Sequence, residues 1–421
     1  MNRYEKVFST IESCEDAIVD YAVNLVRFPT TSGNEKGAQA YVKTIMTDLA
    51  FDPIDMWEPD IEKMHNHPAF ISKRKDFKGS PNVVGILRGT GGGKSLILNS
   101  HIDIVPEGDP DQWHYPPFGG IVENGVIYGR GISDMKGTKA AIFGAIQALR
   151  KANIRVKGDI TVQSVIEEET GSAGTLACAL KGYQADAAII PEPSGFKICP
   201  AQQGSSWFRI HVRGKSAHAG QRYLGVNAIT KSTRVLTAIK TFEDHINKEY
   251  TSFLYKNVPI PFAINIGNIK GGEWPSTVPE HVVIEGRMGV PPGLSLNDAW
   301  EMFERWIKTE TANETWLAEN QPTVEWFGAH WGPAQIDPNH AIVKTATEAY
   351  SKVCETSPKI AGTPWATDGR ILTEFADTPA LVFGPGTSAH CPDEFMKIKD
   401  LICYAKILAA IIIDWCETDA L

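Results

Sequence analysis

The chain has 421 residues, of which 43% are hydrophobic and 22% are charged, a balance typical of a globular protein in water. Its formal net charge of −9 argues against nucleic acid and anionic membrane surfaces as partners, because both carry negative charge themselves. A chain longer than about 300 residues usually exceeds what one hydrophobic core organises, so we expect two domains.

Cysteine usage and the chain ends predict a cytoplasmic protein. The seven cysteines are widely spaced and form no Cys-x-x-Cys pair, a pattern that suits reduced thiols better than a disulfide framework. The N-terminal segment lacks the apolar stretch of a signal peptide. The apolar run at 401–415 contains Lys406 and is too short to span a bilayer, so we expect a buried helix there.

The first half of the chain alternates helical and strand-like patterns. Apolar spacing predicts helices at 9–29, 35–50, 137–151 and 174–181 and strands at 81–87, 95–98, 159–166 and 185–190. The Gly-rich run 89–93 is expected to be a hairpin turn, and the Pro- and charge-rich segment 51–81 a surface excursion. Strands that alternate with helices favour an α/β sheet with many parallel pairs.

The pattern changes after Pro200. Strands are expected at 206–213, 260–269 and 281–288 and helices at 226–248 and 296–309, which together make one α+β unit. From Asn339 the sequence returns to helix, a strand at 380–383 and a C-terminal helix. We therefore expect a catalytic α/β domain built from 1–202 and 336–421, interrupted by an inserted domain at 203–335.

The stretch 100–139 carries the first candidate ligands. His101 and Asp103 follow an apolar run, and Asp134 lies in the Gly-rich sequence YGRGISDMKG. A neutral imidazole ligates metal ions, and a nearby carboxylate fixes its tautomer. By itself this stretch is equally compatible with one surface histidine and two turn-forming aspartates.

Four further stretches carry carboxylates and histidines. Glu167–Glu169, Glu192 and His390 each follow a predicted strand, and His218 lies on a Gly-rich loop of the inserted domain. The acidic triplet taken alone is compatible with a solvated loop. Ligands of open α/β sheets bind beyond the strand ends, however, which favours a shared site.

Two histidines, one aspartate and two glutamates on such loops predict a site for two divalent metal ions. Mixed imidazole and carboxylate donors suit Zn²⁺, with Co²⁺ or Mn²⁺ as alternatives. A metal pair lowers the pKa of water and polarises a carbonyl, and a neighbouring glutamate can carry the proton to a leaving amine. The expected reaction is hydrolysis of an amide.

Six ordered motifs resemble the dinuclear-zinc amidohydrolase and peptidase family of acetylornithine deacetylase, succinyl-diaminopimelate desuccinylase, aminoacylase-1 and glutamate carboxypeptidase. They are SHIDIVPEGDPDQWHYPPF, YGRGISDMKG, EEETGSAG, PEPS, GKSAHAG and GPGTSAHCPDE, and they run from about residue 25 to the C-terminus. The resemblance implies a mixed-sheet metallopeptidase-like catalytic domain with an inserted α+β lid or dimerisation domain. It also implies a homodimer through that inserted domain and a small-molecule N-acyl substrate.

The resemblance also implies a role for each matching residue. His101 and Glu192 would hold one metal ion and Glu169 and His390 the other, with Asp134 bridging both. Asp103 would orient His101, and Glu168 would be the general base. In the inserted domain, His218 would stabilise the oxyanion, Arg287 would bind a substrate carboxylate, and Ser276 stands where the family often has a substrate-contacting Asn. A cis peptide bond commonly follows the bridging aspartate in this family.

Two departures concern substrate recognition. Ser276 is one, and the family's Asp-x-Arg is the other, because it reads Glu285-Gly286-Arg287 here. We therefore expect a metal-dependent hydrolase that removes an N-acyl group from an amino acid or similar small amine, like acetylornithine deacetylase. A dipeptidase or carboxypeptidase with the same centre is the first alternative, and a non-catalytic small-ligand binding homologue is the second.

Overall fold

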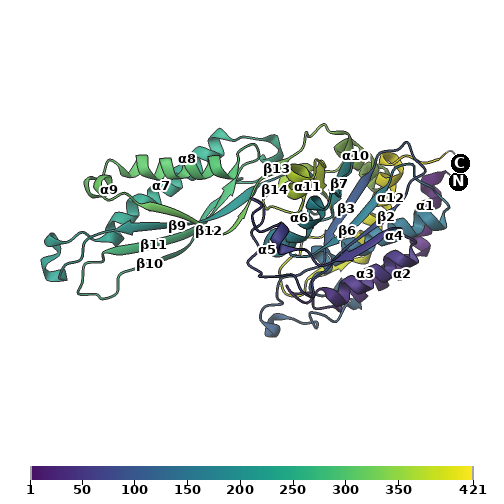
Figure 1. Ribbon diagram of the computed structural model, residues 1–421, viewed down its shortest axis with the longest axis horizontal. Helices are drawn as coiled ribbons and strands as arrows, with labels where there is room; N and C mark the ends of the chain where they lie inside the picture. Colours follow the sequence, from purple (N-terminus) through teal and green to yellow (C-terminus); the bar gives the residue numbers. More distant parts are fainter. Residues whose placement is uncertain (1, 420–421) are drawn as a thin grey trace. The chain divides into compact units, whose positions relative to one another are not determined.

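The computed structural model describes residues 2–419, which divide into two compact units (Figure 1). The first unit comprises the chain up to Ala201, Gln335–Thr363, and the chain from Thr367 onward. The second comprises Gln202–Ala334 together with Pro364–Ala366, a short segment that lies outside the range expected for the inserted domain.

A mixed β-sheet runs through the first unit, and its parallel strands set the position of the site. The order is β1-β2-β6-β3-β7-β15-β8-β13, with β14 beside β8. The strands are β1 (Ile54–Trp57), β2 (Asn82–Leu87), β3 (Leu96–His101), β6 (Ile160–Val165), β7 (Ala187–Ile190), β8 (Ile198–Gln202), β13 (Ala334–Gln335), β14 (Ile360–Thr363) and β15 (Ala380–Val382). Because β6, β3, β7 and β15 pair in parallel, their carboxyl ends lie at one edge of the sheet.

Helices cover both faces of this sheet. The helices of the unit are α1 (Arg3–Ser13), α2 (Glu15–Val26), α3 (Lys36–Asp48), α4 (Gly137–Lys151), α5 (Glu168–Gly171), α6 (Ala173–Leu180), α10 (Ala341–Cys354), α11 (Gly369–Phe375) and α12 (Ile398–Trp415). Helices α1, α2, α4 and α12 pack on one another, and α6 packs on α11 (Figure 1).

Alternation along β3 explains how the two faces are filled. Leu96 and Leu98 pack in the larger hydrophobic core, whereas Ile97 packs in a second core with Ile190 and Leu372. Successive strand side chains point to opposite faces, so a continuous apolar run such as this one needs cover on both. Each of these aliphatic side chains contributes about 1.5–3 kcal/mol when fully buried. The expected mixed α/β fold is confirmed.

Three local predictions are corrected by the structure. The expected helix 9–29 is two helices that meet at Cys14, and α1 begins earlier because the Asn2 side chain accepts the backbone N–H groups of Tyr4 and Glu5. The run 89–93 is not a hairpin turn, since β6 lies between β2 and β3 in the sheet. The segment 51–81 is more than a surface excursion, because it supplies β1 and the buried Phe77.

The second unit has its own antiparallel sheet of order β10-β11-β9-β12. Its main elements are β9 (Gly204–Arg213), α7 (Ala228–Glu249), β10 (Ile264–Gly271), β11 (His281–Val290), α8 (Leu296–Thr311), α9 (Thr315–Glu319) and β12 (Thr323–Trp331). Phe208 on β9 contacts Phe303 on α8, with ring centroids 5.0 Å apart, and Phe303 contacts Phe242 on α7. This unit therefore has a hydrophobic core of its own.

A small antiparallel sheet completes the first unit. Its order is β16-β5-β4, with β4 (Ile121–Glu123), β5 (Val126–Tyr128) and β16 (Phe395–Lys397). The pairing of Phe395 with Tyr128 brings the C-terminal motif beside the chain that leads to Asp134.

Candidate metal centre

The candidate ligands gather at the carboxyl edge of the parallel strands. His101 is the last residue of β3, Glu169 follows β6, Glu192 follows β7, and His390 lies on the loop after β15. Asp134 comes from the irregular turn Ile132–Lys136 that leads into α4. Segments distant in sequence meet here because the parallel pairing aligns their strand ends.

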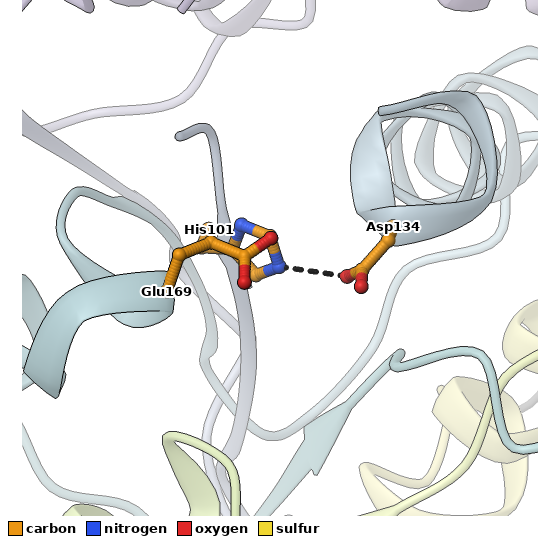
Figure 2. A group of neighbouring side chains, drawn as sticks. All are labelled: His101, Asp134 and Glu169. Atoms are coloured by element: carbon orange, nitrogen blue, oxygen red, sulfur yellow. Dashed lines mark hydrogen bonds and ion pairs between the residues drawn. The ribbon is translucent and has the colours of Figure 1, made fainter. Parts of the chain in front are cut away.

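Asp134 lies between the two histidines. Its Oδ1 is 3.0 Å from His101 Nε2, and its Oδ2 is 3.3 Å from His390 Nε2. Figure 2 shows His101 at the end of its strand, Asp134 at the start of a helix and the Glu169 carboxylate beside the imidazole. The peptide bond between Asp134 and Met135 is cis. One carboxylate thus contacts two imidazoles through different oxygens, which is the arrangement that a bridging ligand needs.

The remaining contacts of the cluster involve three more carboxylates. Glu169 Oε1 is 3.2 Å from His390 Nε2, and Glu192 Oε1 is 3.9 Å from His101 Nε2. Single ligand atoms of His101, Asp134 and Glu169 lie within 4.8 Å of one another, and the same holds for His101, Glu168 and Glu192. The structure therefore brings together all five residues expected as ligands and Glu168.

Asp103 contacts both the histidine and the acidic loop. His101 Nδ1 lies 2.8 Å from the backbone oxygen of Asp103 and 3.7 Å from its carboxylate Oδ1. The carboxylate oxygens accept the backbone N–H groups of Glu168 and Glu169 at 3.2 and 3.1 Å. With Nδ1 directed at an oxygen, Nε2 of a neutral His101 is the nitrogen available to a metal ion.

Negative charge dominates the electrostatics of the cluster. Burial and neighbouring carboxylates raise the pKa of Glu168 and of Glu192 well above their usual range. Hydrogen bonds to Asp134 and Glu169 raise the pKa of His390 to about 10. Burial alone would lower the pKa of His101, but its hydrogen bond to Asp134 and the charge of Glu192 raise it well above its usual range. The neighbouring carboxylates thus favour the protonated imidazoles, and a bound cation would compensate the same negative charge.

A divalent cation fits this cluster. Glu192 Oε1 is buried and has no hydrogen-bond partner among residues 2–419, which is costly unless an ion or a proton compensates it. Imidazole nitrogen and carboxylate oxygen together are the donor set that Zn²⁺ prefers, and Co²⁺ and Mn²⁺ accept the same donors.

A network behind the acidic loop was missed by sequence reasoning. Glu167, whose backbone is left-handed at φ 61°, accepts hydrogen bonds from Ser32 and from Ser72, the latter at 2.8 Å. Arg74 Nη1 lies 3.5 Å from Glu167 and 3.9 Å from the buried Glu35. The only signal in the sequence was a group of basic residues within 51–81, and nothing in the pattern indicated that one of them contacts a carboxylate distant in the chain.

The other predicted residues belong to the second unit. Ala219 N–H donates to the backbone oxygen of Ser276 at 2.9 Å, so the loop of His218 lies beside the loop of Ser276. Arg287, half-buried on β11, forms no ion pair with any carboxylate among residues 2–419, and burial lowers its pKa. Their roles toward a substrate stay predictions.

An α/β protein with this arrangement of imidazoles and carboxylates belongs to the class of metal-dependent hydrolases. The model of peptidase family M20/M25/M40 matches residues 97–414, and the chain belongs to this family. It is accordingly a hydrolase that acts on amide bonds, and the resemblance drawn from the six motifs is confirmed.

Individual relatives agree in length and fold. The N-formyl-4-amino-5-aminomethyl-2-methylpyrimidine deformylase of Bacillus subtilis is 30% identical, covering 97% of this chain and 96% of that protein. The crystal structure of a Staphylococcus aureus tripeptidase has a TM-score of 0.73 at 22% identity, covering 96% and 98% of the two chains. A Bacillus subtilis structure described as a dinuclear metal binding peptidase has a TM-score of 0.68 at 16% identity, covering 97% and 100%. The two structural likenesses show the fold.

Proposed function

We propose that this protein removes a small N-acyl group from an amino acid or a similar amine, with two divalent metal ions at the cluster around Asp134. The observation that supports it most directly is the position of Asp134 between two imidazoles, with a buried oxygen of Glu192, which accepts no hydrogen bond from the described part of the chain, lying 3.9 Å from His101. His101 and Glu192 would hold one ion, Glu169 and His390 the other, and Asp134 both.

Two metal ions at this place would lower the pKa of water and polarise the acyl carbonyl. The chain's own residues supply the proton chemistry. Glu168 follows the carboxyl end of β6, and its carboxylate lies close to His101 and Glu192. It can therefore accept the proton of the attacking water. It can then return that proton to the departing amine, while Asp103 holds the backbone of Glu168 and Glu169 in place.

The second unit would supply the oxyanion donor and the substrate anchor. His218 Nδ1 accepts the N–H of Gly220 at 3.1 Å, so in a neutral ring Nε2 carries the proton and can donate to an oxyanion. The half-buried Arg287 without a carboxylate partner suits a substrate carboxylate, because a guanidinium binds such a group through two parallel hydrogen bonds.

A narrower candidate within this class is an N-formyl amide of an aminomethyl-substituted heteroaromatic ring. It is favoured by the full-length similarity to the Bacillus subtilis deformylase. Ser276 and Glu285, which depart from the family pattern, lie in the unit proposed to recognise substrate and suit a substrate other than N-acetylornithine.

A panel of substrates tests the proposal. We expect the metal-loaded protein to hydrolyse at least one N-acyl compound among N-formyl aminomethylpyrimidines, N-acetylornithine and other N-acyl amino acids, faster than a matched set of dipeptides. A protein that cleaves dipeptides and no N-acyl amine would be a dipeptidase instead. Hydrolysis of neither set, with metal bound, would point to a ligand-binding homologue.

A further inference from the structure

A buried carboxylate outside the predicted site contacts the turn that carries Asp134. Glu394, fully buried just before β16, lies four residues after His390. Its Oε1 accepts the backbone N–H groups of Ser133 and Asp134 at 2.8 and 3.1 Å. Its Oε2 accepts the N–H of Gly131 at 3.0 Å. Three backbone donors between Gly131 and Asp134 thus converge on a single side chain.

A buried arginine completes this arrangement and ties it to the His390 loop. Arg130 Nη1 donates to Glu394 Oε2 at 2.8 Å and to the backbone oxygen of Cys391 at 3.3 Å. The backbone of Glu394 also accepts the N–H of Gly129 at 2.8 Å. Because the pair is buried and every contact is a charge-assisted or backbone hydrogen bond, the two loops are held in one relative position.

The geometry points to Glu394 as a positioning residue of the metal centre. Glu394 fixes the Asp134 carboxylate relative to His390 and thereby sets the affinity for the second metal ion, the one proposed to bind Glu169 and His390. This inference rests on the proposed metal centre. Glu394 accepts the backbone N–H of Asp134 and lies on the loop that carries His390, so its loss affects both ends of the 3.3 Å contact between Asp134 Oδ2 and His390. It affects only one end of the contact between Asp134 and His101, which lies on β3. Groups that orient ligands typically change metal affinity by about 10–100-fold when they are removed.

The test is a calorimetric titration of metal-free Glu394→Gln with Co²⁺ and with Zn²⁺, beside the wild type. Glutamine keeps the volume but places an NH₂ group against N–H donors and removes the ion pair with Arg130. We expect the first binding constant to stay within about threefold and the second to weaken about 10–100-fold. The visible absorption of bound Co²⁺ at the second equivalent should change as well.

A matched variant separates positioning from stability. Glu243, a buried carboxylate of the second unit, accepts the N–H of Ile264 at 2.6 Å and pairs with Lys240 at 2.9 Å. Glu243→Gln should lower the melting temperature of the metal-free protein and leave both binding constants unchanged. A structural role alone would make Glu394→Gln behave in the same way, which would overturn the inference.

A milder variant covers the case in which Glu394→Gln does not fold. Arg130→Lys keeps the positive charge but replaces the guanidinium whose Nη1 contacts both Glu394 and Cys391, and we expect the second binding constant to weaken by about threefold or more. Folded Arg130→Lys with both constants of the wild type would contradict the inference. A wild type that binds no metal would contradict the proposed centre itself, whereas two ions in the wild type and an unchanged Glu394→Gln would contradict only the role of Glu394.

Discussion

At the scale of single residues, Glu168 separates metal binding from turnover. It lies beside the ligands in a group with His101 and Glu192, and burial raises its pKa, which suits a group that takes and returns a proton. We expect Glu168→Gln to lower kcat by about 10²–10⁴-fold while the metal content stays at the wild-type value. Steady-state kinetics and metal analysis of the same preparation check this.

The control for this variant is Glu169→Gln, which removes an expected ligand one residue away. It should lose metal as well as activity. Full activity in Glu168→Gln would remove this residue from the mechanism.

Lys139 leads to a prediction about how the free energy of unfolding depends on pH. Burial lowers the pKa of Lys139 well below its usual range. Its Nζ lies 2.8 Å from the backbone oxygen of Ser100 and within hydrogen-bond distance of the hydroxyls of Ser100 and Ser164, contacts that a neutral amine can make. The unfolded chain holds this proton up to a pH of about 10.4, whereas the folded chain has already lost it. The free energy of unfolding therefore rises with pH between the two pKa values.

We expect Lys139→Met to reduce that rise in urea-unfolding measurements between neutral pH and about pH 10. The exposed Lys43→Met is the matched control and should keep the wild-type slope. The slope should fall and not vanish, since burial also lowers the pKa of Lys136 to about 7. An unchanged slope in Lys139→Met would mean that Lys139 stays charged in the folded protein.

At the scale of elements, the segment before β2 supports the acidic loop after β6. Arg74 is the cation nearest to both Glu35 and Glu167, and its Nη1 also donates to Ser80 at 3.0 Å. Arg74→Ala leaves two buried carboxylates without this partner. We expect a loss of about 1–3 kcal/mol in the free energy of unfolding, because buried charged groups left unpaired carry their desolvation penalty.

Hydrogen exchange provides the second measurement for this element. Backbone amides of residues 70–80 should exchange faster in Arg74→Ala than in the exposed Lys73→Ala. Equal exchange and equal stability in the two variants would show that the network around Glu167 does not hold this segment.

The elements also show what the sequence could predict. Apolar runs such as β3, β6 and β7 were recognisable, because burial on both faces leaves a continuous hydrophobic stretch. The order of the strands could not be recognised, because nothing in the sequence of β2 indicates that it pairs with β6. That pairing separates β2 from β3, so 89–93 is not a hairpin. The break at Cys14 was missed because the apolar spacing of α1 and α2 continues across it.

The candidate site divides in the same way. The ligands stand in motifs at strand ends, so their gathering followed from the parallel pairing of β3, β6 and β7. Glu394 and Arg74 act through backbone groups and buried partners distant in sequence, and neither residue type nor spacing indicates such contacts. The sequence also gives no sign that His101 contacts the backbone oxygen of Asp103 in addition to the Asp103 carboxylate.

At the scale of the whole molecule, we expect a homodimer formed through the second unit. That unit exposes several large hydrophobic side chains, among them Tyr223 at 77%, Trp274 at 69% and Leu224 at 56%, and exposed apolar side chains of this kind mark interaction surfaces when they gather. Light scattering should give twice the mass of one chain. Leu224→Glu should lower the dimer fraction on dilution, and Leu180→Glu in the first unit should not.

A monomeric, fully active wild type would contradict this expectation.

The cytoplasmic location predicted from the sequence stays a prediction. Among residues 2–419 no helix is both long and apolar enough to cross a membrane.

The most direct test of the account is the metal content of protein purified without added metal, measured by mass spectrometry, together with hydrolysis of N-acyl amines before and after a chelator. The account predicts close to two divalent ions per chain, loss of hydrolysis on chelation and its return with Zn²⁺ or Co²⁺. No bound metal after reconstitution, or hydrolysis that a chelator leaves unchanged, would contradict the claim that the cluster around Asp134 is a metal centre.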